Sequence, residues 1–291
     1  MNFKGILLII LGLGIFLRFY QLGDLPPGLN PDEASIGYNA YSLLETGQDR
    51  YGQNLPLAFR SMGTYLLPLY TYLTIVPVAI FGPTIFSVHF ISALSSVLVI
   101  ILTALVALEI KKITLFNKLL IVLLISISPW AVYFGRASHE ISLSLALFVL
   151  SIFLFIKSIS NPKLICITLL IAGLSGYTYY SERYLGLIFF PLLIWIFKNK
   201  FIRHKKYLLV GILFLIISQL PHLVLIRSEA FIRRIEQVNY FSDKAFNEGG
   251  ESDFKFIPFG KAVYILREFS SHYLEYFSPR GLFFEPDPQQ A

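Results

Sequence analysis

The chain has 291 residues, of which 55% are hydrophobic and only 14% are charged, and its mean hydropathy is +0.66. Because average soluble domains carry about 25% charged residues, this composition excludes an ordinary soluble protein and predicts an integral membrane protein. The single cysteine, Cys166, excludes an intrachain disulfide.

Seven apolar segments are long enough to cross a bilayer, for which a helix needs about 20 residues. They are residues 5–22, 84–110, 114–135, 141–158, 164–180, 184–201 and 207–226. We expect the first to be an uncleaved span, because no small-residue cleavage site follows it. The sequence therefore predicts an all-α polytopic membrane protein with about seven transmembrane helices.

A further apolar segment, residues 64–82, decides the topology through the positive-inside rule. If it does not cross, three lysine-rich loops share the cytoplasmic side with the N-terminus; they are 111–118, 157–163 and 198–206. With Lys4, these loops hold eleven of the 24 Lys and Arg residues, and Glu109 is the one acid beside them. We therefore expect 64–82 to be a juxtamembrane helix, and we interpret the net charge of +6 as an orientation signal rather than a nucleic-acid-binding surface.

This topology divides the chain into a transmembrane module, residues 1–226, and an outer C-terminal segment, residues 227–291. The outer loop 23–83 is expected to carry juxtamembrane helices. The predicted location is the cytoplasmic membrane, with the N-terminus inside and any active site on the outer face.

The stretch GLNPDEASIGYNAYSLLETG, residues 28–47, contains a well-specified helix start. Asn30 suits the N-cap, Glu33 the acidic position of a capping box, and Gly47 the C-terminal end. If Glu33 turns back to cap, Asp32 can point elsewhere; a purely structural role for both acids at the helix dipole stays open. The apolar side, expected to lie on the membrane surface, consists of Ile36, Ala40, Leu43 and Leu44.

Two more acid–base clusters fall on the same predicted side of the membrane. Glu140 opens the fourth span beside Arg136 and His139, and Glu182 and Arg183 lie between the fifth and sixth spans. A charged cluster in so short a turn more often lines a cavity than faces lipid, although capping by Glu140 and interfacial anchoring by Arg136 remain open. The distribution predicts a site at the outer leaflet.

Three motifs together carry a resemblance to a known family: LPPGLNPDEASIGYNAYSLLETG, PLYTYL and YFSPRGLFFE. In this order, and along essentially the whole chain, the sequence resembles C-superfamily glycosyltransferases of family 39, the bacterial relatives of protein O-mannosyltransferases and aminoarabinose transferases. The resemblance implies transfer of a sugar from a polyprenyl-phosphate donor to an acceptor hydroxyl or amine, with inversion. It also implies further spans, so the chain is expected to be a fragment or a reduced version.

The candidate site residues follow from this resemblance and from the chemistry of glycosyl transfer, which needs a base for the acceptor and cations for the leaving phosphate. The candidate catalytic residues are Asp32, Glu33 and Glu140, and the candidate lipid-phosphate ligands are Arg183, Arg136 and Arg60. Further donor or acceptor contacts are expected from His139, Tyr70, Tyr180 and Glu182. His89 is expected to be a packed residue rather than a ligand.

The family pattern has an acid and a lysine before the Pro-Leu-Tyr motif, where this chain has Thr64 and Leu66. No cofactor is therefore certain, and a divalent metal stays open. The expected partners are the lipid-linked sugar, the bilayer and a protein, lipid or glycan acceptor, and no nucleic acid. Two other functions remain: a transporter or flippase for a lipid-linked saccharide, which should show repeats or mid-membrane charges, and a non-catalytic scaffold.

Overall fold

The computed structural model describes residues 2–62, 64–138, 140–225, 228, 260–275 and 278. The chain divides into two compact units, residues 1–231 and 232–291, which are described separately. The second unit contributes one described helix, α14 (Gly260–Glu275). Most of the predicted outer segment 227–291, including nearly all of the motif YFSPRGLFFE, lies outside the described residues.

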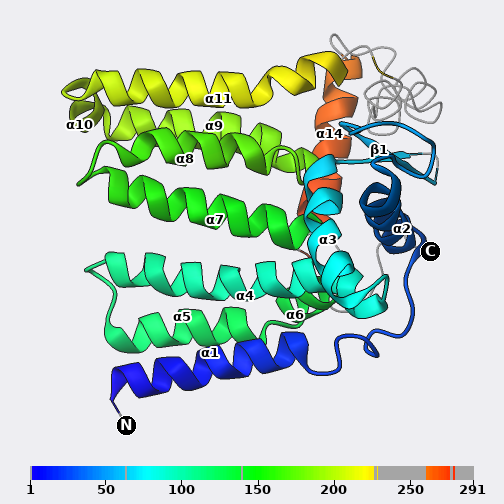
Figure 1. The fold of residues 1–291 in the computed structure, drawn as a ribbon. Coiled ribbons are helices and arrows are strands. Elements are labelled where there is room, and N and C mark those ends of the chain that lie inside the picture. Colours follow the sequence, from blue (N-terminus) through cyan, green and yellow to red (C-terminus); the bar gives the residue numbers. More distant parts are fainter. Residues whose placement is uncertain are drawn as a thin grey trace. The chain divides into compact units, whose positions relative to one another are not determined.

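Seven helices of the first unit lie side by side and roughly parallel (Figure 1). They are α1 (Phe3–Phe19), α4 (Ile85–Glu109), α5 (Leu115–Ile127), α7 (Glu140–Ser158), α8 (Leu164–Ser175), α9 (Tyr180–Ile196) and α11 (Lys205–Leu225). The short helices α6 (Pro129–Arg136) and α10 (Lys198–Ile202) lie between them in sequence. Each predicted span therefore contains a helix, although several bounds differ.

Three of these helices, α4, α7 and α11, are long and apolar enough to cross a membrane. A fourth span results if α5 and α6 count as one helix bent by 48°. The predicted end of the fifth span at residue 180 is wrong, because α8 stops at Ser175 and a turn follows, so α8 has only 12 residues. The structure shows a mostly helical membrane protein, and the count of seven spans stays a prediction.

The bend between α5 and α6 is stabilised by a buried arginine of α1. Pro129 has no N–H, so the carbonyl of Ile125 loses its helical partner; Arg18 Nη2 donates to this carbonyl at 3.1 Å. Arg18 Nη1 donates to the carbonyl of Ser126 at 2.7 Å, and Nε donates to Ser96 Oγ at 2.7 Å. The arginine side chain is fully buried, and it replaces the hydrogen bonds that the break removes.

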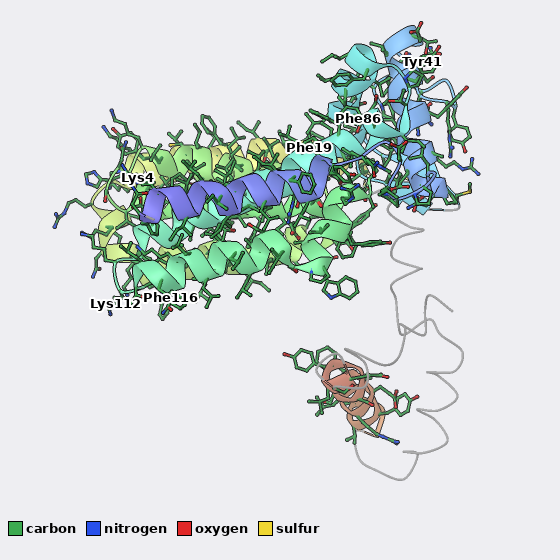
Figure 2. All side chains as sticks on the ribbon, turned by 90° about the horizontal axis from the view of Figure 1, so that it is seen from below. Lys4, Phe19, Tyr41, Phe86, Lys112 and Phe116 are labelled. Carbon is green, nitrogen blue, oxygen red and sulfur yellow. The ribbon has the colours of Figure 1, made fainter. Side chains whose placement is uncertain are left out.

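The two ends of the helical layer differ in charge. Lys4 and Lys112 lie at one end, and Tyr41 of α2 (Pro31–Thr46) lies at the other (Figure 2). At the lysine end, Lys157 Nζ forms an ion pair with Glu109 at 2.5 Å. The predicted cytoplasmic loops and the acidic loop thus sit at opposite ends of the spanning helices.

The first loop forms a compact cap on its end of the helices. It contains α2, a two-stranded antiparallel sheet of β1 (Phe59–Ser61) and β2 (Thr64–Leu66), and α3 (Pro68–Phe81). The all-α prediction is therefore wrong in this detail. In Figure 1, α3 runs across the direction of α4 and α7, as expected of a juxtamembrane helix.

The apolar side of α2 packs on protein. Ile36, Ala40 and Leu43 are at most 7% exposed, and Ile36 and Leu43 belong to a core cluster with Tyr70 of α3 and Leu143 of α7. The prediction that this side lies on the membrane surface is therefore wrong. Three of the four residues predicted for this side are buried against protein, whereas Leu44 is 41% exposed.

Candidate functional site

The N-terminus of α2 divides the two adjacent acids as the capping pattern predicts. The amide of Glu33 donates to Asn30 Oδ1 at 2.9 Å, and the amide of Asn30 donates to Glu33 Oε2 at 2.7 Å. Asp32, one residue earlier in the same turn, is exposed. Its Oδ1 accepts the hydroxyl of Ser61, from β1, at 2.7 Å. Asp32 is thus held at the protein surface with its carboxylate accessible.

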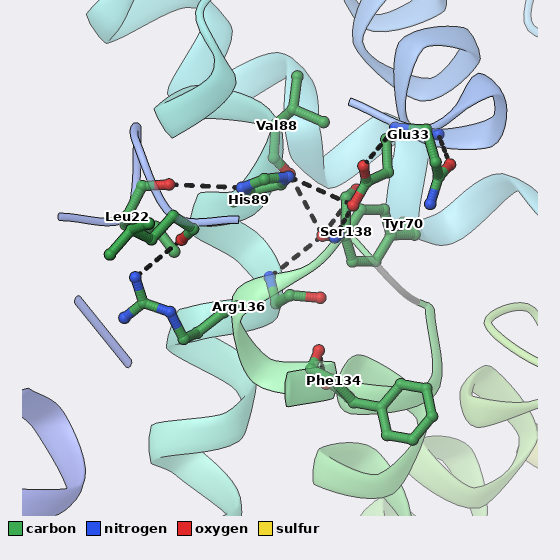
Figure 3. Close-up of polar contacts among 12 residues, drawn as sticks. Leu22, Glu33, Tyr70, Val88, His89, Phe134, Arg136 and Ser138 are labelled. Carbon is green, nitrogen blue, oxygen red and sulfur yellow. Dashed lines mark hydrogen bonds and ion pairs between the residues drawn. The ribbon is translucent and has the colours of Figure 1, made fainter. Parts of the chain in front are cut away.

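Glu33 lies at the centre of a buried polar network (Figure 3). Its side chain is buried, and Oε1 accepts the backbone amide of Ser138 at 2.7 Å. The same oxygen lies 3.2 Å from Nε2 of His89 in α4, and Nδ1 of His89 lies 3.4 Å from the carbonyl of Leu22. Glu33 therefore joins α2 to α4 and to the turn between α6 and α7, which favours a positioning role over direct catalysis.

The charge of Glu33 is stabilised by this network. Burial by itself would raise the pKa of the carboxyl, but the contact with His89 and the hydrogen bonds from the amides of Asn30 and Ser138 outweigh it and hold the pKa below its usual value. A carboxyl with a lowered pKa stabilises the fold above the pKa of the unfolded state and loses that contribution as the pH falls.

We therefore expect the melting temperature to fall on acidification below about pH 4.5, the ordinary value for this carboxyl. Glu33→Gln should melt lower than the parent at pH 7 and show a weaker dependence on acid. Melting curves of both proteins between pH 3 and pH 7 test this. Equal acid sensitivity would show that other carboxyls control the transition.

Tyr70, predicted to contact substrate, is instead fully buried. Its hydroxyl donates to the carbonyl of Val88 at 3.3 Å and accepts from the amide of Ser92 and the hydroxyl of Ser138. Burial first, and the nearby charge of Glu140 in addition, raise the pKa of Tyr70 to about 12. Tyr70 is thus a neutral structural group, and Glu140, half-buried at the start of α7, lies near it.

Arg136, a predicted phosphate ligand, is bound to the protein's own backbone. Nη1 donates to the carbonyl of Leu17 at 2.8 Å, and Nη2 donates to the carbonyls of Tyr20 and Leu25, both at 2.7 Å. These contacts close the C-terminal end of α1, whose carbonyls have no helical partners. In this structure the guanidinium thus binds backbone carbonyls of the protein, a contact that neither the phosphate-ligand prediction nor the interfacial-anchor alternative described.

Two further predicted residues, Arg60 and His139, are not brought to the Glu33 network by the described structure. Arg60 is exposed on β1, with its guanidinium carbon 5.5 Å from the ring centre of Tyr51. His139 lies outside the described residues. Within the described ranges, no group of three or more His, Cys, Asp or Glu side chains is arranged to hold a metal ion.

A cavity of about 690 Å³ opens between α8, α9 and α11. Most of its walls are apolar, including Leu169, Phe190 and Leu215, and it reaches from Arg183 in the first turn of α9 to Lys198 beyond its last turn. The space beside Gly186 is open, because a Cβ there would meet no atom within 4 Å. The result is a groove that follows almost the whole length of α9, about 25 Å for 17 residues.

One end of this groove carries a polar cluster. Arg183 Nη2 lies 2.8 Å from Nε2 of His222, and Nδ1 of His222 lies 2.9 Å from Oε1 of Gln219. Since the guanidinium can only donate, Nε2 must accept and Nδ1 must carry the proton, so this histidine is neutral. The guanidinium also lies over the ring of Tyr180, 4.9 Å from its centre. Glu182 lines the same end and accepts the hydroxyl of Ser181.

The polar end of the groove is joined to the segment that holds Asp32. Ala58 and Leu67, on either side of the β1–β2 hairpin, line the groove. The hydroxyl of Tyr180 donates to the carbonyl of Tyr65 at 3.3 Å, and the amide of Leu69 donates to the carbonyl of Tyr177 at 3.2 Å. The hairpin thus contacts the groove through these residues and the Asp32 carboxylate through Ser61.

Several members of this site were not predicted from the sequence. Ser61, Ser138, Gln219 and His222 were not singled out, and His89 was expected only to pack. Gln219 and His222 are three residues apart in an apolar helix, a spacing that places them on one face. This spacing was the indication in the sequence that the two side chains could act together.

No family model matches the sequence, and no curated protein matches it. Among solved structures, the fold is similar to that of ArnT from Cupriavidus metallidurans, crystallised in the apo state, with a TM-score of 0.60 and 13% sequence identity. The match covers 78% of this chain and 43% of the ArnT chain, so this chain spans less than half the length of that protein. The likeness shows the fold: this is a mostly helical membrane protein with a fold like that of ArnT.

Proposed function

We propose that the protein transfers a sugar from a polyprenyl-phosphate donor to an acceptor hydroxyl or amine at the outer face of the cytoplasmic membrane. The observation that carries the proposal is the groove, with a cation at one end, beside the hairpin that holds Asp32. The likeness to ArnT, an aminoarabinose transferase, supports a transferase of lipid-linked sugars at the level of fold.

The groove suits an isoprenoid phosphate because its chemistry changes along its length. Apolar walls suit a hydrocarbon chain, which can pass from the bilayer into the groove without meeting water. Arg183 at the polar end supplies the donor geometry that phosphate groups accept. A guanidinium at this position would also stabilise the negative charge that develops on the leaving phosphate.

In this proposal, Asp32 removes the proton from the acceptor as its oxygen or nitrogen attacks the anomeric carbon. The bond to the phosphate oxygen breaks on the opposite side of the sugar ring, and the configuration inverts. The lipid phosphate leaves with the electron pair, so no strong general acid is needed. Ser61 orients the Asp32 carboxylate, and Glu140 is the candidate for positioning the acceptor.

The lysine-rich end of the helices supports the proposed orientation. Lys4 and Lys112 lie at the end opposite to α2 (Figure 2). Since cytoplasmic loops carry an excess of Lys and Arg, this arrangement supports an orientation with the first loop outside.

Filling the groove tests donor binding without removing a polar group. Because a Cβ at Gly186 meets open space, Gly186→Leu should fold, and the leucine should occupy the path of the lipid chain. We expect polyprenyl phosphate to bind about 10-fold more weakly, a loss of about 1.4 kcal/mol, measured by native mass spectrometry in detergent micelles.

Gly12→Leu is the matched control, because its Cβ also meets no atom within 4 Å and it lies in α1, away from the groove. Arg183→Gln should weaken binding as well, while Arg203→Gln, exposed beyond α10, should not. Unchanged affinity in both Gly186→Leu and Arg183→Gln would refute the groove as the donor site. Lipid binding without any sugar transfer would instead favour a transporter or scaffold.

A further inference from the structure

His89 is a fully buried histidine whose two ring nitrogens face different elements. Nδ1 lies 3.4 Å from the carbonyl oxygen of Leu22, just after α1, and Nε2 lies 3.2 Å from Oε1 of Glu33 in α2 (Figure 3). Nε2 has no aligned hydrogen-bond partner among the described residues. The contact that this buried nitrogen makes is therefore electrostatic, with the Glu33 carboxylate 3.2 Å away.

Both groups that face the ring are hydrogen-bond acceptors. A carbonyl oxygen accepts, and the Glu33 carboxylate is held in its ionised form by two backbone amides. A neutral imidazole has one N–H and one lone pair, so it would direct a lone pair at one acceptor; only the imidazolium has two donors. The charged ring alone therefore has one N–H for each of the two acceptors.

Among the described residues, the other charged and titratable groups nearby are already engaged. The hydroxyl of Tyr70, from α3, donates a hydrogen bond to the carbonyl of Val88. Burial raises the pKa of this tyrosine, and the charge of Glu140, from α7, acts on it and raises the pKa further. Arg136, from α6, donates to carbonyls around the end of α1. Among the described residues, no Lys or Arg nitrogen lies within 4.0 Å of the Glu33 carboxylate.

We propose that His89 is a positively charged positioning residue, which forms a buried ion pair with Glu33 and thereby places the neighbouring Asp32. The pair joins the end of α1, the N-terminus of α2 and, through the Ser138 amide, the turn before α7. The imidazolium also offsets the charge of Glu33, so Asp32 is presented without a second uncompensated carboxylate behind it. The consequence for catalysis rests on the proposed function; the charge state does not.

Nitrogen-15 NMR of the full chain in nanodiscs tests the charge state directly. The protein has five histidines, and the His89→Gln variant identifies the signals of His89 by their loss. At pH 7.5 we expect both ring nitrogens of His89 to be protonated in the parent protein, and the ring to become neutral in Glu33→Gln. A neutral ring in the parent, or an unchanged charged ring in Glu33→Gln, overturns the proposal.

Asp32→Asn is the matched control, since it removes a neighbouring carboxylate that contacts Ser61 and not His89. Its His89 signals should match those of the parent. A double-mutant cycle adds a second measurement. His89→Gln leaves the Glu33 carboxylate buried without its cation, and Glu33→Gln forces the buried ring to lose its proton, so each single variant should melt lower than His89→Gln/Glu33→Gln. Additive losses would argue against an ion pair.

Transfer kinetics then test the positioning role. Because His89 lies outside the groove, His89→Gln should lower kcat by about 10-fold to 100-fold through misplacement of Asp32, with the donor KM within about 2-fold of the parent. If His89 is charged in the parent protein but His89→Gln leaves kcat unchanged, the positioning role is rejected. If the parent protein shows no transfer, the proposed function fails, while the NMR result still decides the charge of His89.

Discussion

Asp32→Asn should abolish sugar transfer while the protein still folds and binds its donor. An amide keeps the size of the carboxylate and accepts the Ser61 hydroxyl, but it cannot take the acceptor's proton. Loss of a general base lowers rates by about 10²-fold to 10⁴-fold. The measurement is kcat with a polyprenyl-phosphate sugar in proteoliposomes, alongside donor affinity by native mass spectrometry.

Asp24→Asn provides the matched control, because Asp24 is also exposed and belongs to the same outer loop. It carries the same chemical change without the contact to β1, so its kcat should equal that of the parent. Retained transfer in Asp32→Asn would remove Asp32 as the base. Loss of donor binding in the same variant would show instead that Asp32 acts in the donor site.

Arg18→Met should lower the free energy of unfolding by a large amount. Methionine fills similar space but leaves the carbonyls of Ile125 and Ser126 without donors in a buried site. Hydrogen bonds to a charged group contribute about 1.5–3 kcal/mol each, so the loss should exceed about 3 kcal/mol. Thermal unfolding in detergent, followed by circular dichroism, measures the effect.

The exposed Arg203 gives the comparison for this experiment. Arg203→Met should melt within a degree or two of the parent, since exposed substitutions usually change stability by at most about 0.5 kcal/mol. If Arg18→Met and Arg203→Met melt alike, the bend at Pro129 is held by packing rather than by the arginine. Arg18→Lys should recover little, because one ammonium group cannot reproduce the guanidinium's planar set of donors.

The parts of the fold that could be predicted are those determined by neighbouring residues. The helix from Pro31 to Thr46 agrees with its sequence prediction because Asn30, Pro31 and Gly47 act within one turn of each end. The break before Pro129 could not be placed in the same way. Its stabilising partner, Arg18, is more than 100 residues away in sequence, and no local pattern indicates that contact.

The same distinction applies to the site. The division of labour between Asp32 and Glu33 follows from a local capping box, so the sequence could predict it. By contrast, the commitment of Arg136 to carbonyls of the α1 end depends on how distant segments pack. His222 reaches Arg183 only because α8 and α11 approach closely, at a point where a Cβ on Gly173 would clash with Ser218.

If α8 crosses the bilayer, as the sequence predicts, its shortness has a consequence for the surrounding lipid. Its 12 residues measure about 18 Å, whereas the hydrocarbon core of a bilayer is about 30 Å thick. Such hydrophobic mismatch favours local thinning of the bilayer, here next to the groove that α8 lines. Thinner lipid would shorten the path by which a polyprenyl carrier enters the groove from the bilayer. The acyl-chain length of the lipids used for reconstitution should therefore alter the turnover rate.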